Sequence, residues 1–173
     1  MGLTSVPGFY GALPNLRTLD LGHNALRVVP DLSALTRLEI LYLHENALTA
    51  LPKLPSSLTY LNISENPLAS VELGELPRLI ELRMLDLGLT TFPEVALPSL
   101  RELHLRRNAF TEIPEVVRDL TELRLLDLRA NALTSVPEWI AELPRLEKLD
   151  LRWNAVTEPP AALVDRGCVV LWA

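Results

Sequence analysis

Apolar and polar residues follow one spacing that recurs seven times along this 173-residue chain. Written from its first apolar residue, the pattern is Leu-x-x-Leu-x-Leu-x-x-Asn-x-Leu. The copies begin at residues 16, 38, 58, 79, 100, 123 and 146, so neighbouring copies start 20 to 23 residues apart. The middle of the pattern alternates with a period of two, which predicts a short strand with one buried face. Because such a strand is too short to fold alone, the repeat predicts a stack of similar units.

The predicted strands occupy the same place in every copy: residues 18–21, 40–43, 60–63, 81–84, 102–105, 125–128 and 148–151. We expect them to pair in chain order as one parallel sheet with a strand spacing of about 4.8 Å. The first, fourth, sixth and eleventh positions of the pattern then face a shared interior. The second, third, fifth, seventh and eighth positions point outward.

The segments that return the chain from one strand to the next differ along the sequence. Pro114, Pro137 and Pro160 each precede an apolar stripe, which predicts short helices on the side of the stack opposite the sheet. The segment 52–58, PKLPSSL, contains two prolines and predicts extended or turn structure instead.

Six asparagines occupy the ninth position of the pattern. A carboxamide both donates and accepts hydrogen bonds, so these side chains predict a structural ladder that satisfies backbone groups where each strand ends, rather than catalysis. The ladder residues are Asn24, Asn46, Asn66, Asn108, Asn131 and Asn154.

The fourth copy departs from the pattern. A frame that starts at Leu79 places Leu87 at the ninth position, whereas a frame that starts at Leu82 places Thr90 there. We prefer the first frame because it keeps a spacing of 21 residues on both sides. The ladder is then interrupted at Leu87.

The seven copies resemble the leucine-rich repeat family, and the best of them are LRTLDLGHNAL, LRLLDLRANAL and LEKLDLRWNAV. The likeness covers nearly the whole chain. It implies an α/β right-handed solenoid with a parallel concave sheet, and with short helices and extended turns on the convex side. It also implies a non-catalytic module that binds a protein or peptide on the concave face. The alternative is a recognition domain or fragment of a larger bacterial signalling or effector protein whose catalytic domain lies outside this chain.

We expect one domain over residues 1–173. Residues 2–7 match residues 132–137, so residues 1–15 form a half-repeat or cap that lacks its own strand. The first strand then has a free edge, which predicts a monomer or a weak edge-paired homodimer unless residues 8–13 fold back over it. Residues 161–173 form a C-terminal cap with a turn at Gly167 and a last strand, which looks like a natural end of the chain.

Composition and charge narrow the function. The net charge of −6 argues against nucleic acid and anionic membranes as partners. The chain lacks a phosphate-binding glycine motif and any nucleophile with its base, so we predict no enzyme activity and no cofactor. One cysteine, Cys168, and an N-terminus without the pattern of a signal peptide predict a cytoplasmic protein, with a secreted bacterial effector as the alternative.

The three histidines, His23, His44 and His104, fall on the outward side of the predicted strands. His23 and His44 belong to adjacent copies and could approach each other. Two histidines without a third ligand make a poor metal site, so we predict no bound metal.

The outward positions carry two signs of charge. Those of the first four copies hold six acids and two bases, and those of the last three hold four acids and seven bases. Three arginines repeat at one position of successive copies, where either Asp127 and Asp150 neutralise them or an acidic partner binds them. Exposed tyrosine and tryptophan rings add apolar contacts. The predicted partner-binding residues are Tyr42, Tyr60, Arg101, His104, Arg106, Arg129, Arg152 and Trp153.

Overall fold

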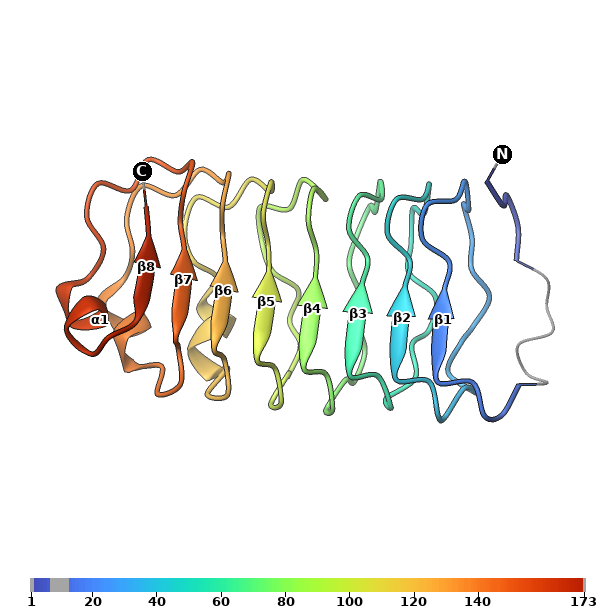
Figure 1. Cartoon of the computed structure of the whole chain (residues 1–173). Helices are drawn as coiled ribbons and strands as arrows, with labels where there is room; N and C mark the ends of the chain where they lie inside the picture. Colours follow the sequence, from blue (N-terminus) through green and yellow to red (C-terminus); the bar gives the residue numbers. More distant parts are fainter. Residues whose placement is uncertain (1, 7–12, 173) are drawn as a thin grey trace.

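Eight short parallel strands form one sheet in the computed structural model, which describes residues 2–6 and 13–172. The strands pair in chain order and lie side by side along a solenoid (Figure 1). They are β1 (Thr18–Asp20), β2 (Ile40–Tyr42), β3 (Tyr60–Asn62), β4 (Glu81–Arg83), β5 (Glu102–His104), β6 (Leu125–Asp127), β7 (Lys148–Asp150) and β8 (Val169–Leu171). The predicted order and parallel pairing are confirmed, although β1 to β7 each end one residue earlier than expected.

The register confirms the frame chosen for the fourth repeat. Leu82 pairs with Leu61 on one side and with Leu103 on the other, so all three occupy the fourth position of their repeats. The residue at the ladder position of this repeat is therefore Leu87.

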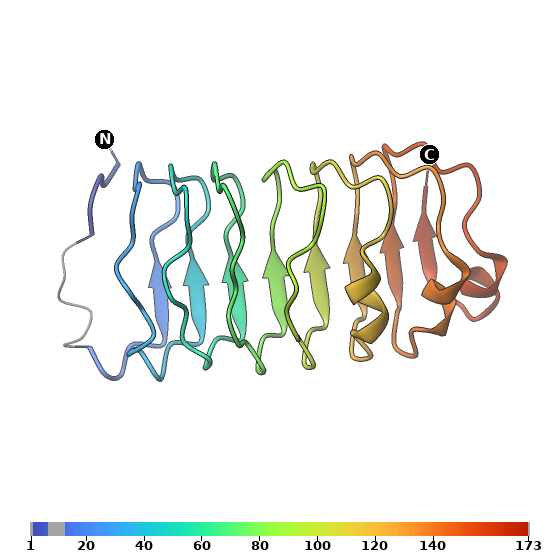
Figure 2. The same ribbon diagram turned by 180° about the vertical axis from the view of Figure 1, so that it is seen from behind.

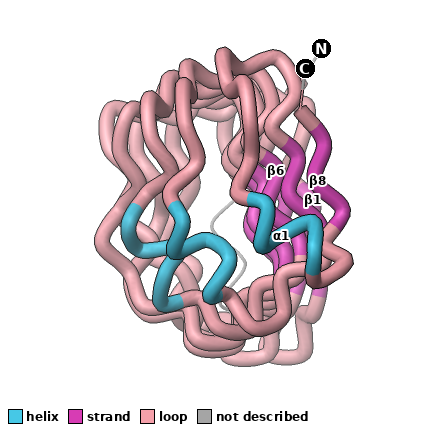
Figure 3. The backbone as a smooth tube through the Cα atoms, turned by 90° about the vertical axis from the view of Figure 1, so that its left-hand side faces the viewer, coloured by secondary structure: helices cyan, strands magenta, loops and turns pink. Residues whose placement is uncertain are grey.

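In residues 2–6 and 13–172, three short helices lie on the return side of the solenoid, away from the sheet (Figures 2 and 3). They are η2 (Glu115–Asp119), η3 (Glu138–Glu142) and α1 (Ala161–Asp165). Each begins directly after one of the three predicted prolines, whose fixed φ suits a helix start and whose missing N–H group has no intrahelical acceptor there. The segment 52–58 contains no helix, as predicted.

Leucines fill the interior between the sheet and the return segments. Those at the fourth position of repeats two to seven, from Leu41 to Leu149, have no exposed surface. Because the register sets each beside its neighbour, the buried residues form one continuous core along the stack. This stacking is what stabilises strands of only three residues, since burying one leucine contributes about 1.5 to 3 kcal/mol.

Residues 2–6 stack on the first repeat as the second half of a repeat would. The backbone N–H of Leu3 donates to Oδ1 of Asn24 at 2.8 Å, and the Leu3 carbonyl accepts from the N–H of Ala25 at 2.9 Å. Leu133 makes the same pair of bonds with Asn154 and Ala155. The predicted fold-back of residues 8–13 falls almost wholly outside the described residues, and the edge-paired dimer at β1 stays a prediction.

The eighth residue of every repeat adopts a left-handed backbone conformation, which the sequence did not lead us to expect. The φ angles lie between 51° and 62°, at His23, Glu45, Glu65, Asp86, Arg107, Ala130 and Trp153. This conformation is unfavourable for residues with a Cβ atom. In the first six repeats it persists because the N–H of this residue donates to a carbonyl of the next repeat, as from Ala130 to Arg152 at 2.9 Å.

We expect Ala130→Gly to raise the free energy of unfolding by about 0.5 to 1 kcal/mol, because glycine has no left-handed penalty to offset. The matched control is Ala132→Gly, two residues away and without a positive φ. The control should lose stability through the greater freedom of its unfolded chain. Urea unfolding of both variants checks the pair, and equal losses would contradict the interpretation.

Candidate binding face on the sheet

The outward side chains of β1 to β7, together with the second residue after each strand, form a surface that we call the sheet face. The register aligns these side chains into rows that run across the strands. One row comes from the last residue of each strand, and His104 lies in it between Arg83 and Asp127. A second row follows the strands and contains Arg106, Arg129 and Arg152.

Two of the three arginines in that second row are paired with buried carboxylates. Arg129 donates to Asp127 through Nε at 2.8 Å and Nη2 at 2.6 Å. Arg152 donates to Asp150 in the same way, at 3.0 and 2.8 Å. Both aspartates are buried, and Arg129 also lies 3.6 Å from Asp150. This is a ladder of bidentate ion pairs across two neighbouring strands.

The ion pairs keep Asp127 charged inside the protein. Burial opposes its ionisation, but hydrogen bonds from the side chain and backbone N–H of Arg129 outweigh burial and hold the pKa of Asp127 well below its ordinary value of 3.8. The hydrogen bond to Asp127 in turn raises the pKa of Arg129. Both groups are therefore ionised at neutral pH.

Arg106 differs from the other two. Its Nε atom is buried and has no hydrogen-bond partner among the described residues, where the guanidinium also forms no ion pair. Arg106 lines a hollow of about 320 Å³ over β4 to β7, which we call the arginine hollow. The hollow is bounded by the bases Arg83, Arg106, Arg129, Lys148 and Arg152, the acids Asp127 and Asp150, and His104, Leu85 and Leu125.

His104 lines this hollow and lies close to three carboxylates. Its Nε2 atom lies 3.4 Å from Glu102 and 3.6 Å from Glu81, and its Nδ1 atom lies 3.9 Å from Asp127. Arg83 binds Glu81 at 2.6 Å and so compensates part of this negative charge. Arg83 and Lys148 were not among the predicted site residues, although both stand at outward strand positions from which their place could have been inferred.

The structure separates the predicted aromatic residues. Tyr42 and Tyr60 contact each other with ring centroids 4.9 Å apart on β2 and β3, outside the arginine hollow. Burial raises the pKa of the Tyr60 hydroxyl, although the nearby Arg83 opposes this, so the ring stays neutral. Trp153 instead lies beyond β7, where it is 62% exposed and its ring centroid is 5.6 Å from the Arg152 guanidinium.

Arg101 lies apart from the other predicted arginines. It immediately precedes β5, at the opposite end of the strands from Arg106, and does not line the arginine hollow. Its side chain is exposed and forms no ion pair within the described parts of the chain. The predicted site thus divides into the arginine hollow with Trp153, the tyrosine pair, and Arg101.

All six predicted asparagines bind backbone groups. Asn131, for example, donates to the carbonyls of Leu105 and Leu128 and accepts from the N–H of Phe110. The equivalent bonds of the other asparagines likewise join two repeats. These contacts leave the carboxamides no part in a surface site.

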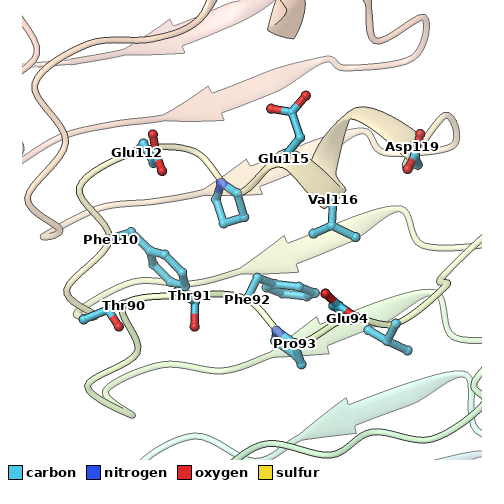
Figure 4. A pocket seen from close by; sticks show the side chains of 12 residues that line it. Thr90, Thr91, Phe92, Pro93, Glu94, Phe110, Glu112, Glu115, Val116 and Asp119 are labelled. Carbon is cyan, nitrogen blue, oxygen red and sulfur yellow. The ribbon is translucent and has the colours of Figure 1, made fainter.

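A second hollow, of about 470 Å³, lies on the return side, where the extended segment 90–95, which follows β4, meets η2 (Figure 4). Phe92, Pro93 and Val116 give it an apolar surface. Its charged lining residues are all acidic: Glu94, Glu112, Glu115 and Asp119. The change from an extended to a helical return segment creates this space.

Family models of leucine-rich repeats match residues 14–56, 57–82 and 98–156. The chain belongs to the leucine-rich repeat family. Human 5T4, a solved structure, superposes on this leucine-rich repeat protein with a TM-score of 0.78 and 29% identity, over 99% of this chain and 73% of 5T4. The resemblance seen in the sequence is therefore confirmed.

Two curated relatives are similar over part of their length. Mimecan from Coturnix japonica is 34% identical over 113 residues, which cover 61% of this chain and 39% of mimecan. The probable serine/threonine-protein kinase pats1 of Dictyostelium discoideum is 38% identical over 115 residues, which cover 61% of this chain and 3% of the kinase. The chain thus spans less than half of either relative. Neither relative supports the predicted bacterial source or cytoplasmic location, which stay predictions.

In the described residues, no helix has the length and apolar character to cross a membrane.

Proposed function

We propose that this leucine-rich repeat protein is a non-catalytic module that binds a protein or peptide through the arginine hollow of its sheet face. Leucine-rich repeat proteins commonly mediate protein–protein interactions, and repeat stacks present extended surfaces for this purpose. The observation that carries the proposal is the guanidinium group of Arg106. This group lacks an acidic partner among the described residues and stands in a hollow with five bases and two acids.

The expected partner is acidic where it touches the hollow. Arginine's planar fork suits carboxylates and phosphates. Arg129 and Arg152 use their Nε and Nη2 atoms on the buried aspartates, so their Nη1 atoms are left to add donors for a bound anion. Trp153, exposed beside Arg152, supplies an apolar anchor of the kind that dominates protein interfaces.

Arg106→Glu tests the proposal with least damage to the fold, because no ion pair of Arg106 within the described residues would be broken. With a fluorescent oligoglutamate peptide as the probe, we expect binding that weakens as salt rises. Arg106→Glu should reduce the affinity about tenfold or more, since a hydrogen bond to a charged group contributes about 1.5 to 3 kcal/mol. Trp153→Ala should raise the dissociation rate.

Arg27→Glu is the matched control, because it makes the same charge change at an exposed residue outside the arginine hollow. It should leave the affinity nearly unchanged. Equal losses from Arg27→Glu and Arg106→Glu would show that only the overall charge matters, and that result would reject the hollow as the binding site.

A second proposal is that the chain is the recognition part of a larger signalling or effector protein with its catalytic domain elsewhere. The match to the probable kinase favours this arrangement, because it covers 61% of this chain and only 3% of that much longer protein. An antibody raised against this chain tests it in the source cells. A native protein near 19.3 kDa would reject the proposal, and a much larger one would support it.

We also propose a cytoplasmic location, with a secreted effector as the alternative. Cys168 is free and buried, and burial raises the pKa of its thiol, which makes the thiol unreactive. With this single cysteine the chain forms no internal disulfide, so its fold does not depend on an oxidising compartment. Cell fractionation with the same antibody distinguishes the two locations.

A further inference from the structure

Two histidines that are distant from the arginine hollow face each other across neighbouring repeats. His23 follows β1 and His44 follows β2, and their rings meet edge to face with centroids 4.6 Å apart. The Nε2 atom of His23 lies 3.2 Å from the Nε2 atom of His44. Both rings therefore direct their outer nitrogens at the same small volume.

We propose that His23 and His44 bind a divalent transition-metal ion of the zinc class, with Glu45 orienting His23. Around a tetrahedral zinc ion, Zn–N distances of about 2.0 to 2.1 Å place two ligand nitrogens about 3.3 Å apart. The observed 3.2 Å already has this spacing. Imidazole is a preferred ligand of zinc, copper and nickel, and water completes the coordination of the ion.

Glu45 is a neighbour of His23 that the spacing of the histidines did not reveal. Its Oε2 atom lies 2.7 Å from Nδ1 of His23, so Nδ1 carries the proton and Nε2 keeps a lone pair for a metal. In metal sites, a ligating histidine usually donates the N–H group of its other ring nitrogen to a carboxylate or carbonyl, which fixes the orientation of the ring. His23 and Glu45 are both eighth-position residues with left-handed backbones, and this shared conformation brings them together.

His44 presents only one nitrogen to a ligand. Its Nδ1 atom is buried and has no hydrogen-bond partner within the described residues. Nε2 is therefore the nitrogen that can bind a metal ion. Gly22 makes room for the ring, because a Cβ atom on Gly22 would lie 2.4 Å from Cε1 of His44. Tyr42 contacts the same ring edge to face, with centroids 5.9 Å apart. The ring is thus held between its neighbours.

A second cluster of possible metal ligands differs from the histidine pair in its charge. Glu81, Glu102 and His104 also bring three possible ligands within 4.8 Å of one another. There, however, Arg83 binds Glu81 at 2.6 Å, so a cation already compensates that cluster. In the described chain, Glu45 contacts no base other than His23. The histidine pair is therefore the site left for a metal ion.

Zinc titration of the tag-free, reduced protein against a chromophoric chelator tests the proposal. We expect one ion per chain and, with Co²⁺ as a substitute, visible d–d absorption from nitrogen ligands. His23→Gln and His44→Gln should each abolish this binding. Glu45→Gln should weaken it about 10- to 100-fold, the usual effect of losing a carboxylate that orients a ligating histidine.

Gly22→Ala is the sharpest variant, because it keeps every ligand and only displaces the His44 ring. Gly22 does not have a left-handed backbone, so alanine is compatible with the fold. We expect Gly22→Ala to lose zinc binding while its urea unfolding stays close to that of the wild type. His104→Gln is the control and should bind zinc normally. Wild-type affinity in Gly22→Ala, or zinc binding that survives removal of both His23 and His44, would overturn the proposal.

Discussion

Arg129→Ala is expected to lower the free energy of unfolding by about 3 to 5 kcal/mol, because removing one partner of a buried ion pair leaves the other charge uncompensated. Asp127 is 4% exposed and accepts two hydrogen bonds from the Arg129 guanidinium. Arg129 also lies close to the second buried carboxylate, Asp150. Urea unfolding at neutral pH measures the loss.

Two further variants isolate the cause. Arg107→Ala removes an exposed pair with Asp86, whose N–O distance is 3.2 Å, and should cost less than about 1 kcal/mol. Asp127→Asn in the Arg129→Ala background removes the stranded charge and should recover part of the stability. A loss for Arg107→Ala as large as that for Arg129→Ala would contradict the argument from burial.

The effect of Arg129→Ala should also depend on pH. The pKa of Asp127 in the folded protein lies below its ordinary value of 3.8, so its contribution to stability is present above that value and is lost as the pH falls further. His104 and Asp150 also lie near this pair. We expect the difference between the wild type and Arg129→Ala to narrow under acidic conditions, and a constant difference would argue against the ion pair as its source.

Asn108→Leu is expected to cost about 1 to 3 kcal/mol by leaving buried backbone groups without hydrogen bonds. The carboxamide donates to the carbonyls of Met84 and Leu105 at 2.7 and 2.9 Å. It also accepts from the N–H groups of Leu87 and Leu89, both at 3.1 Å. No leucine side chain can replace these four bonds.

Leu87→Asn is the reciprocal change, because Leu87 holds the same repeat position. This variant should be tolerated or stabilising, since a carboxamide there faces the strand ends of two neighbouring repeats. Denaturant unfolding of Asn108→Leu and Leu87→Asn compares the two. A greater loss for Leu87→Asn would mean that the ladder does not extend through the fourth repeat.

The spacing of leucines was sufficient to predict the stacked architecture. Alternation with a period of two placed the strands, and the equal spacing around Leu79 predicted the register that pairs Leu82 with Leu103. Prolines placed the starts of η2, η3 and α1. These features are predictable because they depend on local periodicity and on burial, which each repeat encodes in the same way.

Which arginines are paired with buried carboxylates and which one lines a hollow without a partner depended in part on contacts between repeats. Arg106, Arg129 and Arg152 share one repeat position, yet Arg106 alone has no aspartate two residues before it, since His104 stands there. The sequence therefore indicated that Arg106 lacks the aspartate partner of the other two arginines. The depth at which Asp127 and Asp150 are buried, and the hollow that surrounds Arg106, emerge only when neighbouring strands are packed together.

The left-handed eighth residue and the histidine pair required the tertiary structure. Glycine, the usual signal of a positive φ, is absent from that position in all seven repeats, so no local preference indicated the turn. In the first six repeats, hydrogen bonds to the next repeat hold this conformation instead. That backbone, together with the space above Gly22, places His23, His44 and Glu45 in contact, whereas spacing along the sequence predicted only that the two histidines belong to neighbouring repeats.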